Sequence, residues 1–188
     1  FGSDPELVAR MVSAEIAGLH KAGVMSCAKH FPGHGDTKGD THTGYVAVEK
    51  TWDELEACEL IPFVAAINAG TDMIMAAHIT AKNVTDDGLP ASLSKEMITD
   101  KLRGELGYNG VVITDAMSMG AVTSEYTSAE AAVKAFTAGA DIMLMPDDYK
   151  AAFKGIRDAV NDGTISMERL NESVLRILTL KEQYGILK

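Results

Sequence analysis

Long apolar runs and an excess of positive charge are both absent from this 188-residue sequence. No run approaches the about 18 to 20 apolar residues that span a bilayer, so no membrane segment is expected. The 17 Lys and Arg are outnumbered by 27 Asp and Glu, which gives a net charge of −10. Nucleic-acid binding needs clustered Lys and Arg, so no nucleic-acid partner is expected.

Cysteine is also scarce, since Cys27 and Cys58 are the two in the chain. Two thiols without a disulfide-rich spacing exclude a disulfide scaffold and favour free, buried thiols. The chain opens on Phe1 instead of methionine and shows no signal peptide. We therefore expect that its native N-terminus is missing, which leaves localisation open.

What the sequence does contain is an alternation of short apolar segments with longer amphipathic ones. The short segments are predicted strands, at residues 24–28, 72–77, 110–114 and 141–145. The longer segments are predicted helices, which open near Asp4, Thr51, Ser94 and Thr127, with two more after the last strand.

Helix boundaries are the most specific part of this prediction. Asp4 before Pro5 is typical of an N-cap followed by a first-turn proline. Thr51 and Thr127 are each followed three residues later by glutamate, which is the spacing of a capping box. The helix that opens at Thr51 is predicted to run to residue 70 with a bend at Pro62.

The predicted strands are almost continuously apolar, as in parallel sheets that are covered on both faces. Their alternation with helices leaves two architectures, a doubly wound sheet or a (β/α)8 barrel. No Gly-x-Gly-x-x-Gly motif follows a strand, which weakens a dinucleotide-binding fold. Both architectures place their sites at the carboxyl ends of strands, where this sequence has polar residues.

Four strands make only half of an eight-stranded barrel. A half-barrel has unpaired sheet edges and an uncovered inner face, here with apolar strand residues such as Val112 and Met143. We therefore expect that the front half of the barrel is absent from this chain. The missing half, or self-association with another copy, would then cover the exposed face.

One polar loop, residues 29–42, concentrates three histidines, two aspartates and two lysines among its glycines. Such a loop cannot build a core, and three uses of it compete. His34, Asp36, Asp40 and His42 could bind zinc or manganese, although their spacing is not that of a helical ligand pair. The glycines and Lys29 could cradle a phosphate.

Acid–base catalysis is the third use of this loop. In an extended segment, Asp40 and His42 point the same way, and a carboxylate beside an imidazole fixes its tautomer and raises its pKa. A solvated loop with only structural hydrogen bonds is the remaining alternative.

A second group of residues surrounds Asp115, which ends the predicted strand at 110–114. A carboxylate there could be a nucleophile, but it could equally be the N-cap of a helix that starts at Ala116. Met117 and Met119, taken alone, are typical of packing residues.

Together these segments resemble a known family. Lys-His-Phe-Pro-Gly-His-Gly-Asp-Thr at 29–37, followed by Asp-Thr-His at 40–42, resembles the signature of the bacterial β-N-acetylglucosaminidases of glycoside hydrolase family 3. Ile-Thr-Asp-Ala-Met-Ser-Met at 113–119 resembles the family's nucleophile strand, and Met-Ile-Met-Ala-Ala-His at 73–78 also fits. The resemblance covers essentially the whole chain.

This resemblance implies an α/β fold in which residues 1–188 form the C-terminal half of a (β/α)8 TIM-type barrel, strands five to eight with their helices. Asp115 matches the nucleophile, His42 the general acid/base and Asp40 its orienting partner. Lys29 and His30 match residues that hold sugar hydroxyl groups. His34, His78 and Met119 are expected near the rim of the pocket.

The implied reaction is the removal of terminal β-linked N-acetylglucosamine through a covalent glycosyl-enzyme, with no metal or organic cofactor. Cell-wall fragments and chitin oligomers are the implied substrates. A neutral histidine repels an anionic acceptor less than a carboxylate does, so phosphorolysis stays open as a variant. A non-catalytic sugar-binding half-barrel is a further alternative, and the isolated fragment is expected to be inactive.

Two departures from the family's pattern concern the catalytic segments. Thr41 stands where serine is usual between the aspartate and the histidine. Ala116 stands where an acidic residue is common after the nucleophile, so hydrogen bonding around Asp115 is expected to differ.

Overall fold

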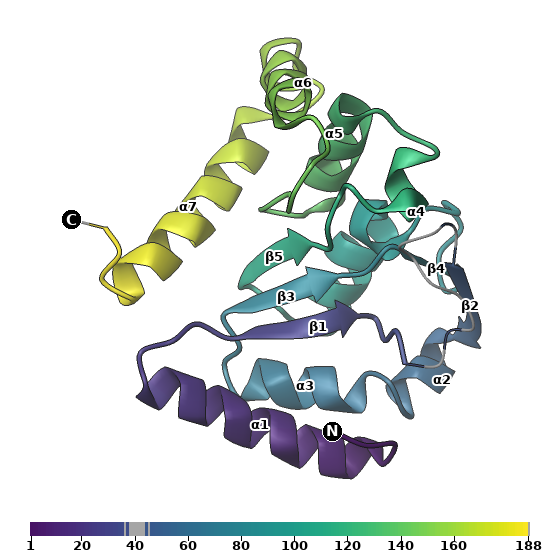
Figure 1. The fold of residues 1–188 in the computed structure, drawn as a ribbon, viewed down its shortest axis with the longest axis vertical. Helices are drawn as coiled ribbons and strands as arrows, with labels where there is room; N and C mark the ends of the chain where they lie inside the picture. The colour runs from purple at the N-terminus through teal and green to yellow at the C-terminus, as the bar shows by residue number, and fades with distance from the viewer. Residues whose placement is uncertain (36, 38–43, 45, 188) are drawn as a thin grey trace.

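Three parallel strands lie at the centre of the computed structural model, which describes residues 1–35, 37, 44 and 46–187. They are β1 (Cys27–Phe31), β3 (Met73–Ala76) and β5 (Val111–Thr114), side by side in that order (Figure 1). Cys27 is in register with Met73, and Met73 with Val111. The predicted α/β class and the parallel pairing are confirmed.

The first strand begins three residues later than predicted. Just before it, the hydroxyl and amide of Ser26 both bind the carboxylate of Asp72, and its carbonyl accepts the amide of Met73 in β3. Because the strand starts later, Lys29 and His30 lie within β1, not after it.

The strand predicted at 141–145 is reduced to a single parallel bridge between Ile142 and Ile113. The carboxylate of Asp141 takes the amide of Val112, and the amide of Leu144 donates to the side chain of Thr114. Met145 then has a positive φ of 46°. Main-chain bonds remain, from the amides of Asp141 and Ile142 to the carbonyl of Val112, but side chains bind two of the amides along this segment, and the pairing stays limited to one bridge.

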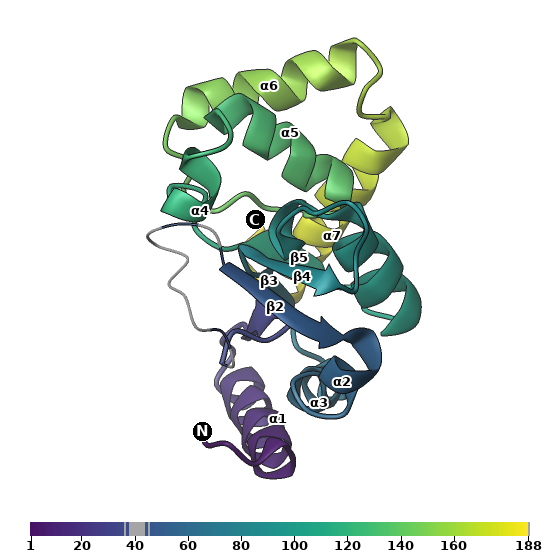
Figure 2. The same ribbon diagram turned by 90° about the vertical axis from the view of Figure 1, so that its right-hand side faces the viewer.

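A second, two-stranded parallel sheet was not predicted. It pairs β2 (Val46–Thr51) with β4 (Ile79–Asn83), and Val46 is in register with Ile79 (Figure 2). Val46, Val48, Ile79 and Ala81 from these strands are buried in the main core.

The helix predicted from Thr51 to residue 70 is broken in two, not bent. It forms α2 (Trp52–Glu56), with the Thr51–Glu54 capping box, and α3 (Ile61–Asn68). Pro62 lies in the first turn of α3, where its missing N–H costs no hydrogen bond. The proline therefore starts a helix.

The other predicted helices are present in the predicted order. Asp4 caps α1 (Pro5–Lys21) by accepting the amides of Glu6 and Leu7. The others are the 3-10 turn η1 (Ala91–Leu93), the π-helical η2 (Glu96–Glu105), α4 (Gly120–Thr123), α5 (Ser128–Ala138), α6 (Tyr149–Asn161) and α7 (Met167–Gln183). Two short ones among them, η1 and α4, were not predicted. Thr127 and Glu130 form the predicted capping box of α5.

Gly139 ends α5 in a left-handed conformation with φ of 118°. A Cβ at this position would lie 2.8 Å from Oγ1 of Thr99 and 2.9 Å from Cγ2 of Ile98. Glycine therefore allows α5 to end in close contact with η2.

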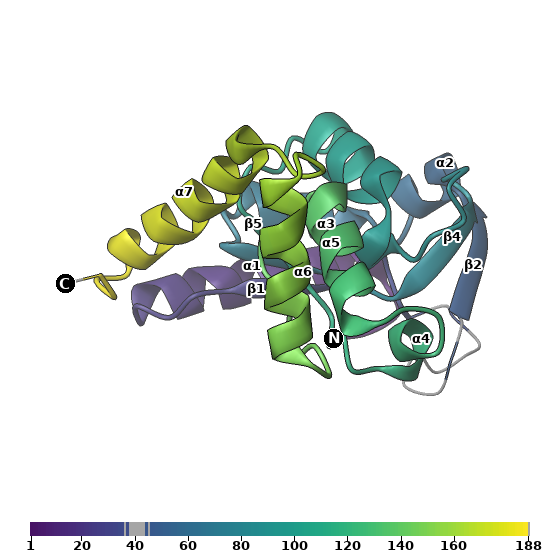
Figure 3. The same cartoon turned by 90° about the horizontal axis from the view of Figure 1, so that it is seen from above.

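Helices cover the sheet unevenly. α1 packs on α3 below β1, and α5 packs on α6 beyond β5 (Figure 1). α7 lies at the opposite end of the molecule from β2 and β4 (Figure 3). Among the described residues, none of the helices is long and apolar enough to cross a membrane.

The two faces of the sheet differ in exposure. Ile74 and Val112, which are in register on one face, are fully buried, so the expected exposure of Val112 is wrong. Met73, Met75, Ile113 and Met143 are only partly buried. Cys27 is exposed and Cys58 is half-buried, so the thiols are free but not buried as predicted.

Candidate active site

Asp115 lies directly after β5, at the edge where the parallel strands end. Its amide donates to the carbonyl of Ala76 at 2.9 Å, and its side chain is 14% exposed. One carboxylate oxygen, Oδ1, accepts the amide of Ala116 at 2.8 Å. No helix starts at Ala116, because α4 begins at Gly120 and has Met119 as its N-cap, so the N-cap interpretation of Asp115 is wrong.

His30 comes to Asp115 from β1. Its Nε2 lies 3.8 Å from Oδ2 of Asp115, and its side chain is 26% exposed. Burial lowers the pKa of His30, while the nearby charge of Asp115 acts in the opposite direction. Lys29, the neighbouring predicted substrate-binding residue, is exposed.

His34 extends this group along the loop after β1. Its ring meets that of His30 edge to face, with centroids 5.9 Å apart. The Nδ1 atom is 2.9 Å from the hydroxyl of Thr37. Before it, Gly33 has φ of 132°, and a Cβ there would lie 2.7 Å from Cβ of Glu59. The chain can approach Glu59 this closely because residue 33 is glycine.

His78 and Met119 are both enclosed. His78 is 1% exposed and follows β3, where it contacts Ser92 and the carbonyl of Ala116. Burial lowers the pKa of His78. Met119 is 6% exposed and its amide also donates to the Ala116 carbonyl.

Asp40 and His42, the predicted acid/base pair, lie outside the described residues, as does Asp36. The alternative metal site of the sequence analysis shares these residues. Within the part of the chain that the structure describes, no group of three or more His, Cys, Asp or Glu side chains could hold a metal ion.

A cavity of about 720 Å³ borders this group along β1, α1 and α3. Lys29, His30 and His34 line it, whereas Asp115 does not. Apolar side chains of α1 and α3, such as Val12, form much of the rest of its lining. The cavity therefore follows the edge of the sheet and reaches the His30 side, but not the Asp115 side, of this pair.

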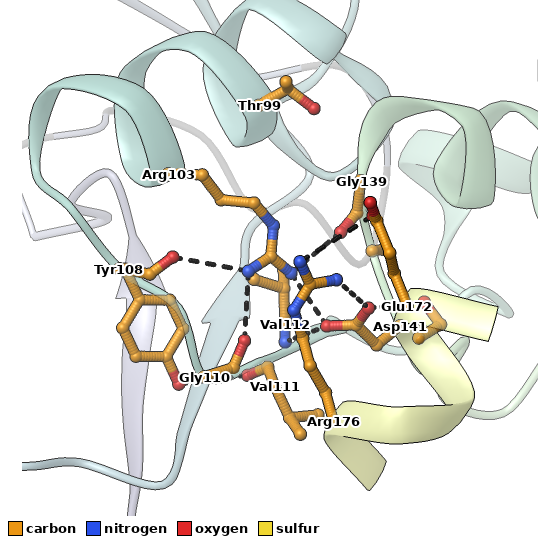
Figure 4. A network of polar contacts seen from close by, with 12 residues as sticks. Thr99, Arg103, Tyr108, Gly110, Val111, Val112, Gly139, Asp141, Glu172 and Arg176 are labelled. Atoms are coloured by element: carbon orange, nitrogen blue, oxygen red, sulfur yellow. Dashed lines mark hydrogen bonds and ion pairs between the residues drawn. The ribbon is translucent and has the colours of Figure 1, made fainter. Parts of the chain in front are cut away.

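A second polar cluster lies at the opposite ends of the strands. Asp141 accepts hydrogen bonds from Arg103 at 2.8 Å, from Arg176 at 3.3 Å and from the amide of Val112 at 2.9 Å (Figure 4). Arg169 lies 3.6 Å from the same carboxylate, and Ser173 donates to it.

The arginines of this cluster are paired as well. Arg103 also donates to the carbonyls of Tyr108, Gly110 and Gly139 (Figure 4). Asp141 and its arginine partners are thus paired with one another and with main-chain carbonyls. Such a cluster joins helices and strands and offers no free group to a ligand. Sequence reasoning missed this cluster, because its residues are far apart in the chain.

Asp72 forms a smaller cluster at the same end. Its carboxylate accepts from the amide and hydroxyl of Ser26 and from the hydroxyl of Tyr184, and His20 Nε2 lies 2.9 Å away. These contacts join α1, β3 and the C-terminal end of α7.

Comparisons with known proteins assign the chain to a family. The family model described as the glycosyl hydrolase family 3 N-terminal domain matches residues 1–180. β-Hexosaminidase A from Pseudoalteromonas piscicida is 35% identical over 201 residues, which cover 96% of this chain and 34% of that protein.

Solved structures are similarly close. A glycoside hydrolase family 3 β-N-acetylglucosaminidase from Paenibacillus sp. str. FPU-7 has a TM-score of 0.96 and 43% identity, covering 98% of this chain and 36% of that one. A β-glucoside phosphorylase has a TM-score of 0.92 and 33% identity, covering 98% of this chain and 35% of that one. This chain thus spans about a third of the length of these relatives. With a domain match over nearly all its residues, the chain belongs to glycosyl hydrolase family 3.

Proposed function

We propose that this chain is part of a retaining glycosidase that removes terminal β-linked N-acetylglucosamine, with Asp115 as the nucleophile. The observation that carries the proposal is the proximity of Asp115 and His30, 3.8 Å apart at the carboxyl ends of parallel strands. Barrel enzymes have their active sites at this end of the strands. The β-N-acetylglucosaminidase among the similar structures supports the choice of sugar.

The contacts of Asp115 suit a nucleophile. One oxygen is occupied by the amide of Ala116, which leaves Oδ2 on the side of His30. In the proposed reaction, Asp115 attacks the anomeric carbon and forms a glycosyl ester as the bond to the leaving oxygen breaks. His42, oriented by Asp40, donates its proton to that oxygen and then removes a proton from the attacking water.

Lys29 and His30 would hold the hydroxyl groups of the sugar. His30 is half-buried, and its lowered pKa favours a neutral ring at pH 7, which can both donate and accept a hydrogen bond. His34, in edge contact with His30, would lie at the rim of the same pocket, and the buried Met119 would lie close behind it. No metal or organic cofactor takes part in this reaction.

We infer that the chain is the C-terminal half of a (β/α)8 barrel, strands five to eight with their helices. Among the described strands, β1 has a neighbour on one side only, and the cavity of about 720 Å³ runs along its other edge. On α7, Leu175 is 66% exposed and Leu178 43%. A preceding strand and helix would cover these surfaces, and the fragment alone would then lack part of the sugar site.

Phosphorolysis is the second candidate, and the similar β-glucoside phosphorylase is the observation that supports it. In that variant, phosphate would replace water as the acceptor in the second step. A sugar-binding half-barrel without catalysis is a weaker alternative, because simple binding does not require a nucleophile such as Asp115.

The test is an assay of the full-length protein with an aryl β-N-acetylglucosaminide, with and without phosphate, and with product analysis. We expect free N-acetylglucosamine that is initially in the β form. Sugar 1-phosphate as the main product would favour phosphorolysis, and an initial α product would contradict the retaining mechanism. The matching aryl β-glucoside is the control for the sugar.

A further inference from the structure

His78 is enclosed next to the segment that carries Asp115. It lies in the connection between β3 and β4 and is 1% exposed. Its Nε2 is 3.0 Å from the carbonyl oxygen of Ala116, and its Nδ1 is 2.6 Å from Oγ of Ser92. A residue so completely enclosed has no surface with which to contact the sugar directly.

The partners of His78 fix its tautomer. A carbonyl oxygen can only accept, so the proton must be on Nε2, and Nδ1 then accepts from the hydroxyl of Ser92. Ser92 is itself fully buried, and its amide donates to the carbonyl of Ala77 at 3.0 Å. The imidazole is therefore held from both sides, and burial, which lowers its pKa, favours the neutral ring.

Asp115 is connected to this histidine through Ala116. The carbonyl of Ala116 accepts from His78, while its amide donates to Oδ1 of Asp115 at 2.8 Å. The amide of Asp115 is in turn bound to the carbonyl of Ala76 at 2.9 Å. The main chain is thus held on both sides of Asp115, by the last residue of β3 and by His78 in the connection that follows it.

We propose that His78 is a positioning residue for Asp115, an inference that rests on the proposed nucleophilic role of Asp115. By holding the Ala116 carbonyl, His78 restrains the main chain of the residue whose amide binds Oδ1, and so helps to keep Oδ2 directed toward the sugar. Ser92 supports this role by fixing the tautomer. Near-attack geometry is sensitive to small displacements, and a shift of about 1 Å can slow a reaction by about 100-fold.

The first test replaces His78 in the full-length protein. His78→Leu removes the donor to Ala116 while keeping an apolar side chain of similar volume. We expect kcat to fall about 10- to 100-fold with KM changed by less than about threefold, because the lost contact orients the nucleophile and not the substrate. His78→Gln offers an amide donor near the position of Nε2 and should recover most of the lost kcat.

The second test uses a matched pair of buried serines. Ser92→Ala removes the hydroxyl that fixes the histidine tautomer, whereas Ser94→Ala removes an equally buried hydroxyl that binds Met97 and Asp87. Both variants should have a lower melting temperature, but kcat should fall, by several-fold, only in Ser92→Ala. Equal kcat values in Ser92→Ala and Ser94→Ala would show that His78 has only a structural role. This comparison remains valid even if His78→Leu fails to fold.

Asp115→Asn, assayed in parallel, distinguishes a failure of the proposed nucleophile from a failure of the positioning role of His78. If Asp115→Asn kept its activity, the proposed function and this inference would both be wrong. If Asp115→Asn were inactive while His78→Leu kept the wild-type kcat, only the positioning role would be overturned. Histidine ¹⁵N spectra provide a readout without turnover, and an Nδ1–H tautomer of His78 at pH 7 would contradict the inference.

Discussion

His30 Nε2 and Asp115 Oδ2 lie 3.8 Å apart, although β1 and β5 are separated in the sheet by β3. The distance is too long for a hydrogen bond, but it is short enough for an electrostatic interaction between the carboxylate and the imidazole. A sugar hydroxyl between the two side chains could contact both. The first two predictions test the chemistry proposed for this pair and the loop beside it.

Replacing Asp115 by Asn in the full-length protein should lower kcat by at least about 1,000-fold, because the amide cannot form the glycosyl ester. Asp147→Asn is the matched control. Asp147 is exposed and follows the segment in which Ile142 forms the bridge to β5. Steady-state rates on an aryl glycoside measure both. If Asp115→Asn kept more than about a tenth of the activity, the nucleophile would have to be sought elsewhere.

Replacing His42 by Ala should slow substrates according to their leaving groups. Poor leaving groups need protonation, so natural disaccharides should slow most and activated aryl glycosides least. The measurement is kcat/KM over a series of leaving groups of increasing pKa. A uniform loss across the series would show that His42 is not the proton donor.

Asp141 should be the most important ionised group for stability. Asp141→Asn leaves Arg103, Arg169 and Arg176 without their shared carboxylate, and we expect a loss of about 3 to 5 kcal/mol in the free energy of unfolding. Asp158→Asn also removes a carboxylate paired with basic side chains, but at an exposed site where solvent screens the charge. The free energy of unfolding, measured in urea, should not change in Asp158→Asn. Equal losses in Asp141→Asn and Asp158→Asn would show that the buried cluster contributes no more to stability than an exposed ion pair.

The Asp72 cluster should make stability sensitive to acid. Burial by itself raises the pKa of Asp72, but hydrogen bonds from Ser26, His20 and Tyr184 outweigh it and hold the pKa below its usual value. The folded state is therefore stabilised above the unfolded-state pKa, about 3.9, and the gain is lost as the pH falls through the lower folded-state value. Unfolding measured from pH 5 down to pH 2 should show a shallower decline in Asp72→Asn than in the wild type.

Tyr184 tests the same cluster from the side of α7. Tyr184→Phe removes the hydroxyl that binds both oxygens of Asp72 and should lower stability at pH 7 by about 1 to 2 kcal/mol. Tyr149→Phe, at a residue that is 67% exposed, is the control and should change little. If both variants were as stable as the wild type, the contact between α7 and Asp72 would contribute nothing.

The 188-residue chain expressed alone should associate with itself or with a separately expressed front half of the barrel. The reason is the open edge of β1 together with the exposed apolar side chains of α7, such as Leu175. Analytical ultracentrifugation over a range of concentrations measures this. A compact monomer at high concentration would count against the half-barrel proposal.

Local features of this fold were predictable from the sequence. The caps at Asp4, Thr51 and Thr127 bind amides only two or three residues away, so the spacing of residue types already specifies them. The apolar segments at β3 and β5 likewise indicated buried parallel strands, and the position of Asp115 after such a segment located it at a strand end.

Contacts between distant segments were decided only by the tertiary structure. Just before β1, Ser26 binds Asp72, and along 141–145 the side chains of Asp141 and Thr114 bind main-chain amides. The same holds for the three arginines around Asp141 and for His78 behind Ala116. Each of these contacts joins residues far apart in the chain, and their energies depend on burial that no local spacing specifies.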